Sequence, residues 1–167
     1  GLAAAAAVPL LSHDDRDLET RARYRALGAR IAEFPLARAV HADARARGEH
    51  VVMGAPNVLR GGSHKPGNPS AAEMAAAGLC NVLTSDSYYP APLHAAFRLA
   101  DDGLLPLEQA WNLVAANPAE ALGLVDRGHI EVGRRADLLL VDPGTGERGP
   151  DVVATLVGGR CAFVSAE

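Results

Sequence analysis

Residues 51–90 read VVMGAPNVLRGGSHKPGNPSAAEMAAAGLCNVLTSDSYYP, and this stretch decides the fold. The apolar run at 51–53 predicts a strand. Ser70, with Glu73 three residues later, predicts the start of a helix that ends at Gly78. A second apolar run, at 79–84, predicts the next strand. The stretch therefore contains one strand–helix–strand unit, with a long glycine-rich loop at 54–68 after the first strand.

The same alternation extends in both directions. Apolar runs at 8–11 and 29–34 predict two earlier strands, and polar-faced segments predict helices at 16–28, 36–48 and 92–99. Strands that alternate with helices indicate a parallel sheet flanked by helices, hence an α/β fold. Four such units make half of a TIM-type (β/α)8 barrel, in which the loops after the strands carry the chemistry.

The C-terminal part changes character near residue 127. Two helices are expected to meet at Asn117-Pro118, with Asn117 as the cap and Pro118 at the first helical position. Short β-rich runs follow, and Gly158-Gly159 between two of them is a hairpin signal. We therefore divide the chain into a barrel portion, 1–126, and a small antiparallel β-element, 127–167.

The composition and net charge argue against some classes of function. The 167 residues are 49% hydrophobic and 22% charged, with a net charge of −4, which is typical of a globular protein. Mild acidity disfavours nucleic-acid and membrane-surface binding, and no apolar run reaches the length of a membrane span. The two cysteines form neither a metal-binding spacing nor a disulfide framework, so a cytoplasmic location is expected.

Polar residues that follow the strands are candidates for a metal site. His13 and Asp86 each come after an apolar strand, and an imidazole with a carboxylate suits a divalent metal such as zinc or manganese. Asp86 could also take a proton from a metal-bound water. Asp14 and Glu33 are further candidates at the same rim. The alternative is that these residues cap helices or form turns.

The loop after residue 53 suggests an anion site. Arg60 offers a planar fork for phosphate oxygens and Lys65 a point charge, while Gly61 and Gly62 allow close approach of the backbone. Ser63 and His64 complete the expected substrate-binding set, although His64 could instead be a metal ligand or general acid, and Asn57 is a further candidate. The alternative is a flexible, solvated loop.

A longer motif carries a family resemblance. Residues 117–142, NPAEALGLVDRGHIEVGRRADLLLVD, closely resemble the C-terminal signature of the amidohydrolase superfamily. The resemblance implies the C-terminal half of the barrel and a β-sandwich built from both chain ends. It also implies that Asp86 is the last-strand metal ligand and proton acceptor, and that His13 is a metal-binding histidine.

Other strings give a narrower resemblance. SHDD at 12–15, GAPNVLRGGSH at 54–64 and SDSYYPAPLHAAFRLA at 85–100 together resemble the α-D-ribose 1-methylphosphonate 5-triphosphate diphosphatases of the carbon–phosphorus lyase pathway. This implies a small-molecule substrate, a triphosphorylated ribosyl phosphonate, from which pyrophosphate is released. The string at 63–70, SHKPGNPS, departs from the family pattern because Lys65-Pro66 lengthen the loop.

The superfamily's first-strand His-x-His pair and its bridging ligand do not occur in this sequence. We therefore expect a C-terminal portion of a roughly twice-longer enzyme, or a truncated gene product, that is inactive in isolation. Two alternatives stay open: an amidohydrolase that acts on a C–N bond, such as a deaminase or deacetylase, and a non-catalytic domain. Self-association into a homo-oligomer also stays open.

Overall fold

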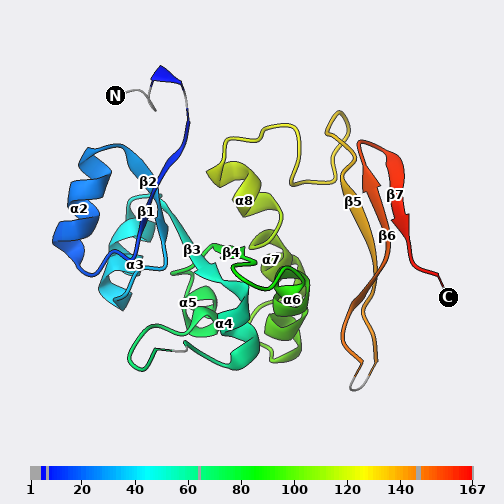
Figure 1. Cartoon of the computed structure of the whole chain (residues 1–167), viewed down its shortest axis with the longest axis horizontal. Helices are drawn as coiled ribbons and strands as arrows, with labels where there is room; N and C mark the ends of the chain where they lie inside the picture. Colours follow the sequence, from blue (N-terminus) through cyan, green and yellow to red (C-terminus); the bar gives the residue numbers. More distant parts are fainter. Residues whose placement is uncertain (1–4, 7, 64, 146–147, 167) are drawn as a thin grey trace.

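The computed structural model describes residues 5–6, 8–63, 65–145 and 148–166. Its centre is a four-stranded parallel sheet in which the strands lie in chain order (Figure 1). The strands are β1 (Leu10–His13), β2 (Ala29–Glu33), β3 (His50–Gly54) and β4 (Val82–Thr84). The α/β alternation expected from the sequence is therefore confirmed, and all four strands end at the same edge of the sheet.

Seven helices connect or follow these strands in the described part of the chain. They are α2 (Leu18–Ala26), α3 (Arg38–Ala46), α4 (Ala55–Arg60), α5 (Ala71–Ala76), α6 (Ala91–Asp101), α7 (Leu107–Asn112) and α8 (Ala116–Ala121). The predicted cap of α5 is confirmed, because the side chain of Ser70 accepts a hydrogen bond from the backbone N–H of Glu73.

One helix corrects the prediction of a continuous loop at 54–68. Residues Ala55–Arg60 form α4, which starts directly after β3. Pro56 suits its first turn, since the N–H that proline lacks has no partner there. Gly61 ends the helix with a left-handed φ of 77°. The glycine-rich loop is thus shorter and begins at the helix end.

The start of α8 also differs from the prediction. The helix begins at Ala116 with Ala115 as a cap that makes no side-chain hydrogen bond, so Asn117 is not the cap and Pro118 is not the first helical residue. Instead, Asn117 Nδ2 donates a hydrogen bond of 2.8 Å to the carbonyl of Asn81, just before β4. A tertiary contact thus uses the side chain that would otherwise have capped the helix.

The two faces of the sheet pack differently. Met53 and Leu83 contact the main core, which includes the fully buried Leu99 of α6. The opposite face forms a smaller cluster of Ile31, Val52 and Val82, against which Ala121 of α8 packs. The strands are therefore held by apolar contacts on both faces, and their polar ends stay accessible.

A second sheet comprises β5 (Leu138–Asp142), β6 (Asp151–Val157) and β7 (Arg160–Val164), paired antiparallel. Gly158 and Gly159 join β6 to β7 with φ values of 57° and 77°, as the predicted hairpin turn requires. This sheet lies next to α6 and α7, apart from the parallel sheet (Figure 1). Among the described helices, none is long and apolar enough to cross a membrane.

Candidate functional site

A pocket of about 290 Å³ opens at the edge where the parallel strands end. It brings together residues that are up to 73 positions apart in the chain, because the carboxyl ends of parallel strands meet at one edge. Seven of the candidates named from the sequence line it: His13, Asp14, Asn57, Arg60, Ser63, Lys65 and Asp86.

His13 is the last residue of β1, and Asp14 follows it directly. Nδ1 of His13 lies 3.3 Å from Oδ2 of Asp14, and both side chains are about half exposed. The His13 and Phe34 rings also form a T-shaped pair, with centroids 5.2 Å apart and an interplanar angle of 83°. These contacts leave Nε2 as the imidazole nitrogen available to a ligand in the pocket.

Asp86 lies on the other side of the pocket, two residues beyond the end of β4. A Cβ built on Gly54 would lie 3.7 Å from Oδ2 of Asp86, so the carboxylate packs over the last residue of β3. Asp86 therefore lies over the end of the neighbouring strand, where both Gly54 and Asp86 line the pocket.

The backbone at this edge has an unusual shape. Asp14, Phe34 and Asp86 have φ values of 57°, 51° and 50° and are the non-glycine residues with positive φ in the described part of the chain. All three line the pocket. Left-handed backbone is costly for a bulky residue such as phenylalanine, and such conformations cluster at functional sites. This feature marks the pocket independently of its charged residues.

Two cations also line the pocket. Arg60 comes from the last turn of α4, and Lys65 from the loop that follows. The backbone N–H of Lys65 donates to Oγ of Ser63 at 3.1 Å. In the part of the chain that the structure describes, the ion pairs involve neither Arg60 nor Lys65. Their charge is thus available to an anion. The candidate His64 lies outside the described residues.

The expected close approach of a ligand to the backbone of Gly61 and Gly62 is not supported by the structure. Their N–H groups donate to the carbonyls of Val58 and Asn57, at 3.1 and 2.9 Å, and thereby cap the C-terminus of α4. Neither glycine lines the pocket. The backbone amides of these two glycines are therefore not available to a ligand in the pocket.

Asn57 shapes the pocket through the backbone. Its Oδ1 accepts a hydrogen bond of 2.9 Å from the N–H of Ala71, and its Nδ2 donates to the carbonyl of Pro69 at 3.3 Å. Because both ends of the amide are engaged, Asn57 fastens the loop between α4 and α5. Glu33 does not line this pocket but a separate cavity of about 230 Å³ beside α8.

A buried histidine supports the wall formed after β2. Nε2 of His41 lies 3.0 Å from the carbonyl of Pro35, a pocket residue, and Nδ1 lies 3.2 Å from the carbonyl of Leu79. Burial lowers the pKa of His41, although the two carbonyls act in the opposite direction. His41 is therefore a structural residue, in its neutral form near pH 7.

The donor types in the pocket match a zinc or manganese ion, which binds imidazole nitrogen and carboxylate oxygen. Within residues 5–6, 8–63, 65–145 and 148–166, however, no group of three or more His, Cys, Asp or Glu could hold a metal. His13 and Asp86 come from the two outer strands, which lie about 14 Å apart at ordinary strand spacing. The donors therefore fit such an ion in kind but form an incomplete set.

Several residues that line the pocket were not among the site residues predicted from the sequence. Phe34, Pro35 and Leu36 follow β2, and Asn68 and Pro69 end the loop before α5. Their position after a strand or inside the cationic loop was a usable signal. Their side chains, however, belong to no pattern of metal-binding or phosphate-binding residues.

Comparison with known proteins places the chain in a family. Residues 4–163 match the family described as amidohydrolase family. The alpha-D-ribose 1-methylphosphonate 5-triphosphate diphosphatase of Escherichia coli (strain K12) is 51% identical over 136 residues, which are 80% of this chain and 35% of the relative. A dihydroorotase of Halobacterium salinarum is 50% identical over 54 residues, 32% of this chain and 12% of that protein.

Solved structures show the same fold. An amidohydrolase from Thermotoga maritima MSB8 superimposes with a TM-score of 0.73 at 23% identity, over 94% of this chain and 44% of that one. A D-hydantoinase from Thermus sp. gives 0.63 at 16% identity, over 89% and 49%. The chain thus spans about a third of the Escherichia coli relative and just under half of these solved enzymes. It belongs to the amidohydrolase family, as its C-terminal signature indicated.

Proposed function

We propose that this chain contributes the phosphate-binding side of a metal-dependent hydrolase. The enzyme would convert α-D-ribose 1-methylphosphonate 5-triphosphate to the 5-phosphate and pyrophosphate in phosphonate catabolism. The observation that carries the proposal is the composition of one pocket, where Arg60 and Lys65 face the same space as His13 and Asp86. The similarity to the Escherichia coli diphosphatase supports this substrate class.

The reaction needs charge neutralisation more than covalent chemistry. A water oxygen attacks the α-phosphorus, the bond from this phosphorus to the α–β bridging oxygen breaks, and pyrophosphate leaves. Arg60 and Lys65 would hold the negative phosphate oxygens, and Ser63 would donate a further hydrogen bond. Asp86, which lines the same pocket, would accept the proton of the attacking water. Preorganised positive charge of this kind stabilises the charge that builds up on the phosphoryl oxygens.

His13 and Asp86 would provide two ligands of a divalent metal such as zinc or manganese. A bound cation of this type lowers the pKa of its water and polarises a phosphoryl oxygen. Because the solved amidohydrolases are about twice as long as this chain, the remaining ligands would come from the part of the family fold that it does not span.

The same proposal includes the place of this chain in the fold of the whole enzyme. Residues 1–126 would form the C-terminal half of a (β/α)8 barrel, and residues 127–167 one sheet of a β-sandwich. In support, β1 to β4 are consecutive parallel strands, and Leu11 on the outer strand β1 is 52% exposed. On this proposal the chain by itself is inactive.

A chimaera tests the function. The matching region of the Escherichia coli diphosphatase would be replaced by this chain, and release of pyrophosphate from the triphosphate substrate would be measured. We expect activity from the chimaera and its loss in Asp86→Asn, which keeps the shape of the side chain but removes the base. Asp102→Asn, a change of an exposed carboxylate at the C-cap of α6, is the matched control. Activity of Asp86→Asn within a few-fold of the chimaera would remove Asp86 from the mechanism.

The same chimaera decides between reaction classes. The short matches to dihydroorotases favour a C–N hydrolase as the second candidate. Arg60 and Lys65 in the pocket favour the diphosphatase reaction, since a triphosphate carries several negative charges that two adjacent cations would neutralise. Ammonia release or ring opening without pyrophosphate would favour the second candidate. Inactivity toward both substrate classes would favour a non-catalytic domain.

A further inference from the structure

Ser12 and His13 end β1, and Asp14 and Asp15 follow in the β1–α2 turn. His13 and Asp14 line the pocket with half-exposed side chains. Ser12 and Asp15, on either side of them, are 3% and 0% exposed. The two candidate site residues are therefore enclosed by two buried polar residues in the same short segment.

The buried pair is held by one arginine. Nη1 of Arg21, from α2, donates to Oγ of Ser12 at 2.6 Å and to Oδ2 of Asp15 at 3.0 Å. Oγ of Ser12 in turn donates to the same Oδ2 at 2.7 Å, which closes a triangle of hydrogen bonds. The backbone continues the attachment, because the carbonyl of Asp15 accepts from the N–H of Leu36, a pocket residue on the next loop.

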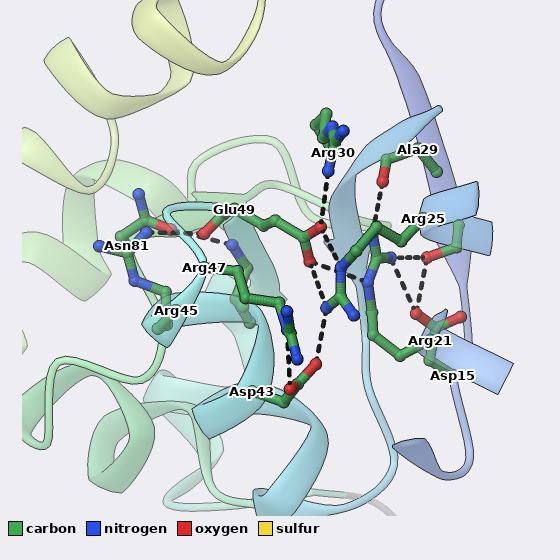
Figure 2. Close-up of polar contacts among 12 residues, drawn as sticks. Asp15, Arg21, Arg25, Ala29, Arg30, Asp43, Arg45, Arg47, Glu49 and Asn81 are labelled. Atoms are coloured by element: carbon green, nitrogen blue, oxygen red, sulfur yellow. Dashed lines mark hydrogen bonds and ion pairs between the residues drawn. The ribbon is translucent and has the colours of Figure 1, made fainter. Parts of the chain in front are cut away.

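The other side of Arg21 is also fixed. Its Nη2 donates to the carbonyl of Ala29 and its Nε donates to Oε2 of Glu49 at 3.0 Å. Figure 2 shows the guanidinium between Glu49 and Asp15, with every nitrogen directed at a partner. A fully buried, fully engaged arginine has little freedom to move, so the turn attached to it is held against the second strand.

Stability alone is a weak reason for this arrangement. A buried ion pair contributes little net stability, since the cost of removing two charges from water offsets their attraction. In the described part of the chain, Oδ1 of Asp15 is buried without a hydrogen-bond partner, which adds to the cost. The clear structural consequence is a fixed β1–α2 turn, in which Asp14 keeps its left-handed backbone.

We propose that Arg21, Asp15 and Ser12 are positioning residues that fix the β1–α2 turn and thereby hold the imidazole of His13 in the pocket. The inference rests on the proposed function, because it takes His13 as a metal ligand. The three residues act through His13 and touch no substrate.

The test uses nuclear magnetic resonance of the imidazole signals in the metal-free 167-residue chain. The rings of His13 and Phe34 are in T-shaped contact, so a displaced imidazole changes the ring-current shift of its carbon-bound protons. We expect Asp15→Asn and Ser12→Ala to move the His13 signals away from their wild-type positions. Ser12→Ala keeps the Arg21–Asp15 ion pair and guards against failure of Asp15→Asn to fold.

Two controls separate positioning from loss of stability. Asp17→Asn removes a neighbouring exposed carboxylate and retains a good helix cap. Asp43→Asn weakens the neighbouring ion pair with Arg25 and leaves the contacts of Arg21 intact. We expect both controls to leave the His13 signals unchanged. Wild-type His13 signals in folded Asp15→Asn and Ser12→Ala would overturn the inference.

Addition of Zn²⁺ distinguishes the two proposals. If His13 is a ligand, Zn²⁺ shifts its signals in the wild type, and Asp15→Asn raises the dissociation constant roughly tenfold or more while Asp17→Asn does not. Absence of a Zn²⁺ response in the wild type would count against the metal role of His13. The metal-free comparison would still decide whether the three residues fix the turn.

Discussion

Glu49→Gln should destabilise the protein strongly. Glu49 is 2% exposed, and its carboxylate accepts hydrogen bonds from Arg21 at 3.0 Å and from Arg25 at 2.6 and 2.9 Å. Removing one member of a buried ion network leaves the opposite charges uncompensated, which costs about 3–5 kcal/mol. For a chain of this size that corresponds to a fall in melting temperature of roughly 6–20 °C.

Asp43→Asn is the matched control. Asp43 also binds Arg25, at 2.6 Å, but its side chain is 24% exposed and pairs with the exposed Arg47 as well. Water screens such a pair, so the expected cost is about 1 kcal/mol or less. Urea unfolding at pH 7, followed by circular dichroism, measures both free energies. The reasoning is refuted if Glu49→Gln costs no more than Asp43→Asn.

The difference in stability between the wild type and Glu49→Gln should also depend on pH. Burial would raise the pKa of Glu49, but hydrogen bonds and charges from Arg25 and Arg21 outweigh it and hold the pKa below its ordinary value of 4.5. A carboxylate with a depressed folded pKa stabilises the protein above its unfolded pKa and loses this contribution as the pH falls through the folded value. The stability gap between wild type and Glu49→Gln should therefore shrink below about pH 4.5. A gap that stays constant down to pH 3 would contradict this assignment.

Two further changes probe the pocket and its support. In the active chimaera, Arg60→Ala should raise KM for the triphosphate by about tenfold or more with a smaller effect on kcat, because a hydrogen bond to a charged group contributes about 1.5–3 kcal/mol. Arg47→Ala is the surface control, and unchanged kinetics in Arg60→Ala would show that Arg60 does not bind the substrate. His41→Gln tests the buried imidazole. Since burial lowers the folded pKa of His41, the unfolded chain takes up a proton first, and stability falls as the pH drops below about 6.5. In His41→Gln, the dependence of the unfolding free energy on pH between pH 5 and 7 should be weaker by up to about 1.4 kcal/mol per pH unit, as measured by urea unfolding. An unaltered dependence would show that His41 does not cause it.

The sequence by itself determined the local elements of this protein and their order. The four strands, the cap at Ser70 and the Gly158-Gly159 turn were predicted because apolar periodicity, helix capping and left-handed glycine conformations depend on residues within a few positions of one another. The family assignment likewise rests on contiguous motifs. The position of the candidate site residues after the strands could also be read from neighbouring residues, once a parallel sheet had been inferred.

Only the tertiary structure decided which of those candidates meet. His13 and Asp86 share a pocket and Glu33 does not, although all three come at or just after the end of a strand. Asn117 bonds Asn81 rather than capping its own helix, and Arg21 becomes fully buried among carboxylates. Such outcomes depend on contacts between residues far apart in the chain. A polar side chain is recruited by whichever partner the fold brings within hydrogen-bonding distance, and no pattern of nearby residues records that partner.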